Sequence, residues 1–206
     1  MLKGVECDIG IHDRAMKWAR PVLEQWLRVH RDYMEETGFS DSLYWYTERT
    51  NIGALAGAVW RCGGYAVEEY GALKGKDADE SNGRVDLFFM LSDYEVVVEA
   101  KQCWIYLSKN NRRDFHLDIS KAIEVALSDI RRTQDSLNHK YAIGIVFFPT
   151  YAKDLEESRE SMGRFLDAIK STDCSFYALL QNTSGDSLIS VNDEHCDAIA
   201  MVGVRI

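Results

Sequence analysis

The sequence has no long hydrophobic run: nowhere are eighteen consecutive residues apolar, so we expect no membrane span. Its first residues also lack the apolar stretch of a secretory signal, and the two absences together predict a cytoplasmic protein. The five cysteines form no Cys-x-x-Cys pair, and the five histidines show no metal-ligand spacing. We therefore expect free thiols and no zinc site.

Basic residues are fewer than acidic residues. The chain has 24 lysines and arginines against 33 aspartates and glutamates, a net charge of -9. Such a balance argues against a protein that coats nucleic acid nonspecifically. It does not exclude a nuclease, because acidic metal ligands add negative charge and the contact with DNA can be local or supplied by a partner.

Repeats, low-complexity tracts and interdomain linkers are missing too, so residues 1–206 are expected to form a single domain. Hydrophobic periodicity and turn signals predict a mixed α/β order of elements. Pro21 is expected either to begin the first helix or to bend it, and Asn82-Gly83 is expected to form a turn. The predicted helices are 13–37, 47–61, 118–139 and 155–169, and the predicted strands are 65–70, 84–91, 95–104, 141–149, 175–181 and 197–205, with a weaker edge strand at 187–191.

Three charged residues in two neighbouring strands carry the functional signal. Glu99 and Lys101 are two positions apart in a valine-rich strand, so their side chains face the same way. Asp86 is an acid among apolar residues of the preceding strand. Because Asp86 and Glu99 are each six or seven positions from a turn near Asp93, hairpin pairing places them close together. Burying such charges is costly without a partner or a task.

Two carboxylates this close repel each other, and a divalent cation is the usual remedy. A cation there polarises a phosphate oxygen and lowers the pKa of a bound water that attacks phosphorus. Lys101 would orient that water or offset charge on the phosphate. The backbone carbonyl of Ala100 is a further candidate ligand.

The spacing of Asp86, Glu99 and Lys101 resembles the PD-(D/E)XK nuclease superfamily. The resemblance covers a core of about residues 45–150, with the helix at 13–37 and the C-terminal helix and strands as additions. It implies a restriction-endonuclease-like fold, a central mixed β-sheet flanked by helices on both faces. Val85 stands where the eponymous motif has proline. The family often takes another acid from the helix before the first core strand, and Glu48 matches that place.

The resemblance further implies an enzyme that cleaves DNA with Mg²⁺ or Mn²⁺. We expect an endonuclease, and the sequence leaves an exonuclease open. Asp86, Glu99, Glu48 and the Ala100 carbonyl would hold the metal, and Lys101 would assist the nucleophile. Some subgroups also use a glutamine, for which the candidates are Gln102 and Gln134. A basic segment contains the candidate phosphate contacts Lys109, Arg112 and Arg113, although a solvated loop explains these residues equally well.

Two other interpretations remain open from the sequence. The first is a catalytically silent nuclease-like module for binding or assembly, which the acidic net charge favours. The second is a structural ion-pair network without catalytic purpose. Besides DNA, a second copy of the chain or a partner protein is left open as a binding partner.

Overall fold

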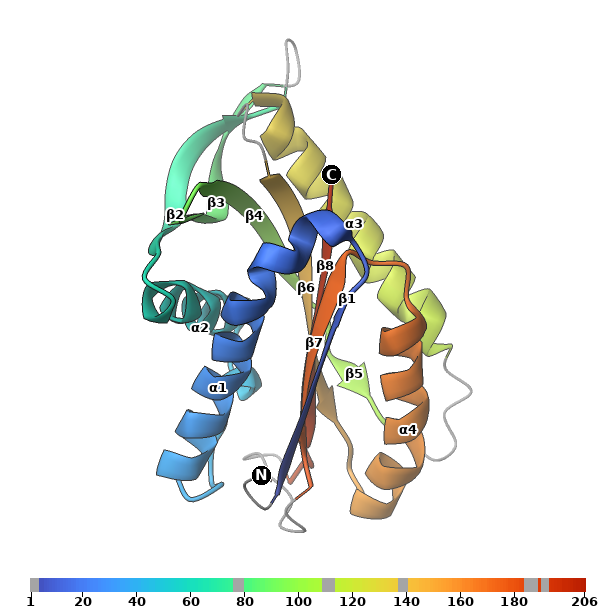
Figure 1. Ribbon diagram of the computed structural model, residues 1–206. Helices are drawn as coiled ribbons and strands as arrows, with labels where there is room; N and C mark the ends of the chain where they lie inside the picture. The colour runs from blue at the N-terminus through green and yellow to red at the C-terminus, as the bar shows by residue number, and fades with distance from the viewer. Residues whose placement is uncertain (1–3, 76–79, 109–113, 137–140, 184–188, 190–192) are drawn as a thin grey trace.

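The computed structural model describes residues 4–75, 80–108, 114–136, 141–183, 189 and 193–206. Four α-helices and two short 3₁₀ helices accompany the strands in this part of the chain (Figure 1). The strands are β1 (Val5–Ile11), β2 (Tyr65–Lys74), β3 (Ser81–Leu91), β4 (Tyr94–Gln102), β5 (Ile105–Tyr106), β6 (Tyr141–Tyr151), β7 (Phe176–Asn182) and β8 (Ala198–Arg205). The helices are η1 (Arg14–Ala19), α1 (Arg20–Glu36), η2 (Leu43–Trp45), α2 (Glu48–Arg61), α3 (Phe115–Ser136) and α4 (Leu155–Ser171).

The described strands form one eight-stranded mixed sheet in the order β1-β7-β8-β6-β4-β3-β2, with β5 paired to β6. β2, β3 and β4 form an antiparallel meander, and β4 pairs with β6 in parallel. The parallel pairing is possible because α3 carries the chain from one end of the sheet to the other. β4 is therefore a central strand, as its three consecutive valines predict.

Helices cover both faces of this sheet, with α1 and α2 on one side and α3 and α4 on the other (Figure 1). The α1–α2 side buries a core that includes Trp26, Leu55 and Val98. The other side buries two clusters, one around Phe165 of α4 and one around Ile130 of α3. The predicted mixed α/β architecture, a central sheet flanked by helices on both faces, is confirmed.

The helix predicted at 13–37 divides into a 3₁₀ turn and α1. Pro21 lies at the first turn of α1, where its missing N–H costs no hydrogen bond, so the proline begins the helix and does not bend it. Gly38, with φ +61°, follows its end. α3 begins at Phe115, three residues earlier than predicted. None of the described helices is long and apolar enough to cross a membrane.

One strand prediction is wrong, one strand was missed, and one prediction stays untested. Asn82 and Gly83 are not a turn but lie within β3, opposite Leu73 and Ala72 of a longer β2. β1 was not predicted at all; it pairs with β7 at the edge of the sheet. The weak strand expected at 187–191 falls almost wholly outside the described residues, apart from a single bridge between Ile189 and His195.

Candidate active site

β3 separates from β4 at Asp86. The two strands pair from Leu91↔Tyr94 to Leu87↔Val98, and continuing that register would set Asp86 opposite Glu99. Instead, the backbone N–H of Ala100 donates to Oδ2 of Asp86 at 2.7 Å. A side-chain carboxylate thus takes a hydrogen bond from the β4 backbone where pairing with β3 stops. Asp86 is thereby held against the segment that carries Glu99.

β3 and β2 both change the face that they present to the two cores, and they do so beside Asp86. In a regular strand, residues two apart share a face. Leu87, however, packs in the α1–α2 core, whereas Val85 packs with Ile130 of α3. On β2 the same change falls at Glu69, whose φ of +53° is in the left-handed region. Beyond this point the β2–β3 ribbon curves away from β4 and over the C-terminal part of α3 (Figure 1).

Glu48 is the first residue of α2, and its carboxylate lies in the electrostatic field of the β4 end. The pKa of Glu48 is raised overall, most strongly by burial and further by the Asp86 and Asp129 charges. The Lys101 charge and a hydrogen bond from the Gln102 N–H act in the opposite direction. The charges of Glu48, Asp86 and Asp129 all act on the Lys101 ammonium.

Lys101 is paired with an acid of α3. Its Nζ lies 2.7 Å from Oδ2 of Asp129, and both side chains are about a third exposed (33% and 35%). Burial acts to lower the pKa of Lys101, but the Asp129 hydrogen bond and the Asp129, Asp86 and Glu48 charges raise it overall. The ammonium is therefore held in its charged form at the edge of the site.

Glu99 is buried deeper, with 2% of its side chain exposed. Its Oε1 accepts from Lys74 Nζ at 2.6 Å and from Thr133 Oγ1 at 2.6 Å. Burial raises the pKa of Glu99 to about 7; the Lys74 and Thr133 hydrogen bonds lower it, and the Asp86 charge raises it. Glu99 and Lys101 share a face of β4 as predicted, but each is bound to a different partner.

α3 approaches the sheet closely beside Glu99. Gly144 of β6 is the partner of Glu99 in the parallel ladder. A Cβ added to Gly144 would lie 3.1 Å from the backbone carbon and oxygen of Ala126. The absence of a side chain at residue 144 therefore lets α3 descend onto β4 and β6, and this brings Asp129 and Thr133 to Lys101 and Glu99.

Gln102 lies at the site, but its amide is engaged within the protein. Its Oε1 accepts from Asn51 Nδ2 at 2.8 Å and its Nε2 donates to the Tyr46 carbonyl at 3.0 Å. These contacts fix the start of α2, and with it Glu48, against the end of β4. Gln134 lies in α3 and is partly buried. Lys109, Arg112 and Arg113 lie outside the described residues.

The oxygen donors suit a hard divalent cation, because Mg²⁺ and Mn²⁺ prefer carboxylate and carbonyl ligands. Nevertheless, no group of three or more acidic, histidine or cysteine side chains in the described part of the chain is placed to hold a metal ion. The contacts explain this: Glu99 is engaged by Lys74 and Thr133, and Asp86 by Ala100. The residues fit the ion chemically, but Lys74 is a cation already paired with Glu99 and would compete with a metal ion for that carboxylate.

Sequence reasoning missed Lys74, Asp129 and Thr133. For the last two a signal was present: Ala126, Asp129, Ile130 and Thr133 are spaced three or four apart, so an acid and a hydroxyl lie in the apolar stripe of their helix. For Lys74 no signal existed, because it begins a polar segment, residues 74–83, in which only the Asn82-Gly83 turn was predicted. Only the curvature of the ribbon brings Lys74 to Glu99.

Comparison with known proteins adds little. No protein-family model and no curated protein matches the chain. A solved structure described as "Crystal structure of SSO0001" is 13% identical, over 63% of this chain and 60% of that chain, at a TM-score of 0.26. The chain therefore spans less than two thirds of that protein's length, and a likeness this slight bears on neither fold nor function.

Proposed function

We propose that the protein is a metal-dependent nuclease that hydrolyses DNA phosphodiester bonds, as an endonuclease. In this proposal the segment from α2 to β6 is a restriction-endonuclease-like core of the PD-(D/E)XK type. The observation that carries it is the break between β3 and β4, where the Asp86 carboxylate is bonded to Ala100 of the Glu99-x-Lys101 strand. Glu48 and Lys101 lie within electrostatic reach of the same carboxylate.

Each residue has a task that follows from its surroundings. Glu48, Asp86 and Glu99, with the Ala100 carbonyl, would hold Mg²⁺ or Mn²⁺. That ion supplies a polarised phosphate oxygen and a bound water of lowered pKa. Lys101 stays protonated beside Asp129, so it can orient the nucleophilic water or offset charge on the phosphate. Gln102 positions α2, and so Glu48, through Asn51 and the Tyr46 carbonyl.

A catalytically silent module is the second candidate, and a specific contact favours it. The buried Lys74–Glu99 pair neutralises the acid that a metal would need. A protein that never binds metal would keep Glu99 paired in this way permanently. In an active enzyme, Lys74 would compete with the metal ion for the Glu99 carboxylate.

The test is cleavage of supercoiled plasmid and of single-stranded DNA with Mg²⁺ or Mn²⁺, comparing the wild type with Lys101→Ala. The nuclease proposal predicts metal-dependent cleavage that Lys101→Ala abolishes while its unfolding free energy stays nearly unchanged. Lys170→Ala is the matched control, since Lys170 is paired with Asp8 at 3.0 Å outside this site.

The other interpretations predict different results. A structural ion-pair network predicts no cleavage. It also predicts marked destabilisation by Lys101→Ala, because the substitution leaves partly buried carboxylates without a cationic partner. A silent module predicts no cleavage by any variant. Cleavage that survives Lys101→Ala would contradict the assignment of the site.

A further inference from the structure

Two arginines converge on one carboxylate beside the site. Nε of Arg49 lies 3.1 Å from Oε1 of Glu69, and an Nη atom of Arg84 lies 3.3 Å from Oε2 of the same residue. The two cations come from different elements, α2 and β3. Glu69 therefore holds two guanidinium groups close together, one on each of its oxygens.

This cluster adjoins the candidate catalytic residues. Arg49 follows Glu48 directly, and Arg84 precedes Asp86 by two positions. On β2, the neighbours of Glu69 pair with the neighbours of Asp86, as Glu68↔Leu87 and Tyr70↔Val85. Glu69 therefore lies across from Asp86, at the point where both strands change face. Its φ of +53° is an unusual conformation for a non-glycine residue, of the kind found where a site constrains the backbone.

Both arginines are accessible to a ligand. The side chains of Arg49 and Arg84 are 72% and 66% exposed. Lys74, by contrast, is 17% exposed and committed to the buried Glu99. The net charge of -9 repels a phosphate backbone overall, so an exposed pair of guanidinium groups beside the site provides a local attraction.

We propose that Arg49 and Arg84 bind phosphates of the nucleic-acid backbone and so guide the substrate toward Asp86 and Lys101, with Glu69 holding the guanidinium groups in place. Guanidinium groups bind phosphate oxygens through paired N–H donors, which suits them to this task. The contact is with the backbone and carries no sequence preference. The inference rests on the proposed nuclease function and assigns its substrate contact.

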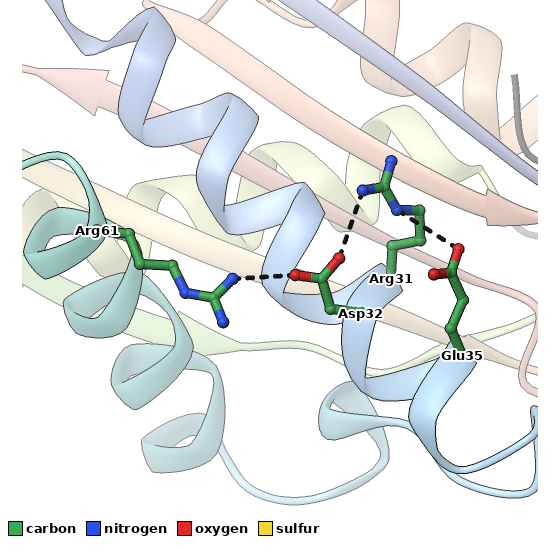
Figure 2. Close-up of polar contacts among 4 residues, drawn as sticks. All are labelled: Arg31, Asp32, Glu35 and Arg61. Atoms are coloured by element: carbon green, nitrogen blue, oxygen red, sulfur yellow. Dashed lines mark hydrogen bonds and ion pairs between the residues drawn. The ribbon is translucent and has the colours of Figure 1, made fainter.

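The chain offers a matched control in a second arginine cluster. Arg61 of α2 lies 3.1 Å from Asp32 of α1, which also contacts Arg31, and Arg31 in turn reaches Glu35 (Figure 2). The Arg61 side chain is 50% exposed. Arg61 stands at the other end of α2 from Arg49, so Arg61→Ala removes a comparable exposed charge away from the site.

The experiment measures binding without cleavage. Fluorescence anisotropy of a labelled DNA duplex and of a labelled single strand, in EDTA and over a series of salt concentrations, compares the wild type with Arg49→Ala, Arg84→Ala and Arg61→Ala. Arg49→Ala and Arg84→Ala are expected to weaken binding several-fold. Each should also lower the slope of log affinity against log salt by about 1, as the loss of one phosphate contact does. Arg61→Ala should bind as the wild type does.

Two results would overturn the inference. One is unchanged affinity and slope in Arg49→Ala and Arg84→Ala; the other is a wild type that binds neither DNA in EDTA. Neither result decides the proposed function, which the metal-dependent cleavage assay tests separately. Because the two arginines are exposed, a loss of fold does not confuse the comparison, and thermal unfolding of each variant checks this.

Discussion

The carboxylate of Asp86 accepts a hydrogen bond from the backbone N–H of Ala100 at 2.7 Å, where β3 separates from β4. Ala100 is fully buried, so its N–H has no access to water. One side chain therefore both satisfies the backbone of β4 and brings a negative charge to the candidate site. Structural and chemical roles of Asp86 can be separated by substitution.

Asp86→Ala should destabilise the fold by about 2 kcal/mol, because it leaves a buried N–H without an acceptor. Asp86→Asn keeps an oxygen acceptor of the same reach, and its cost should be under about 1 kcal/mol. Denaturant unfolding of both variants beside the wild type checks the difference. Equal stability of Asp86→Ala and the wild type would mean that the hydrogen bond contributes nothing.

Lys74→Met should destabilise the protein by about 3 kcal/mol, because the buried Glu99 loses its cationic partner. The double variant Lys74→Met/Glu99→Gln should recover part of this loss, since the stranded charge is gone. Lys170→Met is the control: its pair with Asp8 is half-exposed, so we expect a change below about 1 kcal/mol.

The same Lys74→Met variant probes the metal. With Lys74 gone, Mg²⁺ is the natural replacement for the missing positive charge at Glu99. The melting temperature of Lys74→Met should therefore rise more with millimolar Mg²⁺ than that of the wild type. A rise no larger than in the wild type would show that Lys74 does not compete with a cation.

His30 should make the protein sensitive to acid. It is fully buried beside Trp26 and Tyr44, and within the described residues neither ring nitrogen has a hydrogen-bond partner. Burial lowers the pKa of His30 from 6.5 to about 3. Between these values the unfolded chain binds a proton that the folded protein does not, so stability is full above pH 6.5 and falls as the pH drops toward 3.

His30→Leu should flatten this pH dependence, since the replacement has no titrating group. The measurement is the unfolding free energy of both proteins at several pH values across that window. If the two curves stay parallel from neutral to acid pH, His30 does not cause the acid sensitivity.

Gly144→Ala should cost about 1–3 kcal/mol, because the new Cβ would crowd the α3 backbone at Ala126. The substitution should also loosen Asp129 and Thr133 above the site. Gly163→Ala is the contrasting control: Gly163 lies in α4, and a Cβ there would meet nothing within 4 Å. That variant should gain about 0.5–1 kcal/mol from helix propensity. Thermal unfolding of the two variants compares them directly.

The sequence predicts the central part of the fold well, because local signals agree there. Three local patterns each identify an element: the valines of β4, the turn at Ser92 and Asp93, and the apolar stripe of α2. The sequence does not predict β1, whose mixed polar and apolar residues resemble a loop and which becomes a strand only by pairing with β7. Such long-range pairing leaves no local pattern.

The candidate site follows the same division. Glu99 and Lys101 share a face because strand alternation is local. Glu99 is paired with Lys74 because β2 and β3 change face at Glu69 and Asp86. This change curves the β2–β3 ribbon over α3 and brings Lys74 to Glu99. The residues around Lys74 show no local pattern that predicts this curvature. The pairing of Lys74 with Glu99 could therefore be found only from the structure.

The most direct test of the proposed site is nicking of supercoiled plasmid in Mn²⁺ by the wild type and by Asp86→Asn, with the folded state of both verified by thermal unfolding. We predict that the wild type nicks the plasmid, that EDTA stops it, and that Asp86→Asn stays folded but inactive. Nicking by Asp86→Asn at the wild-type rate would contradict the central claim, and so would a folded wild type that leaves the plasmid intact in Mn²⁺.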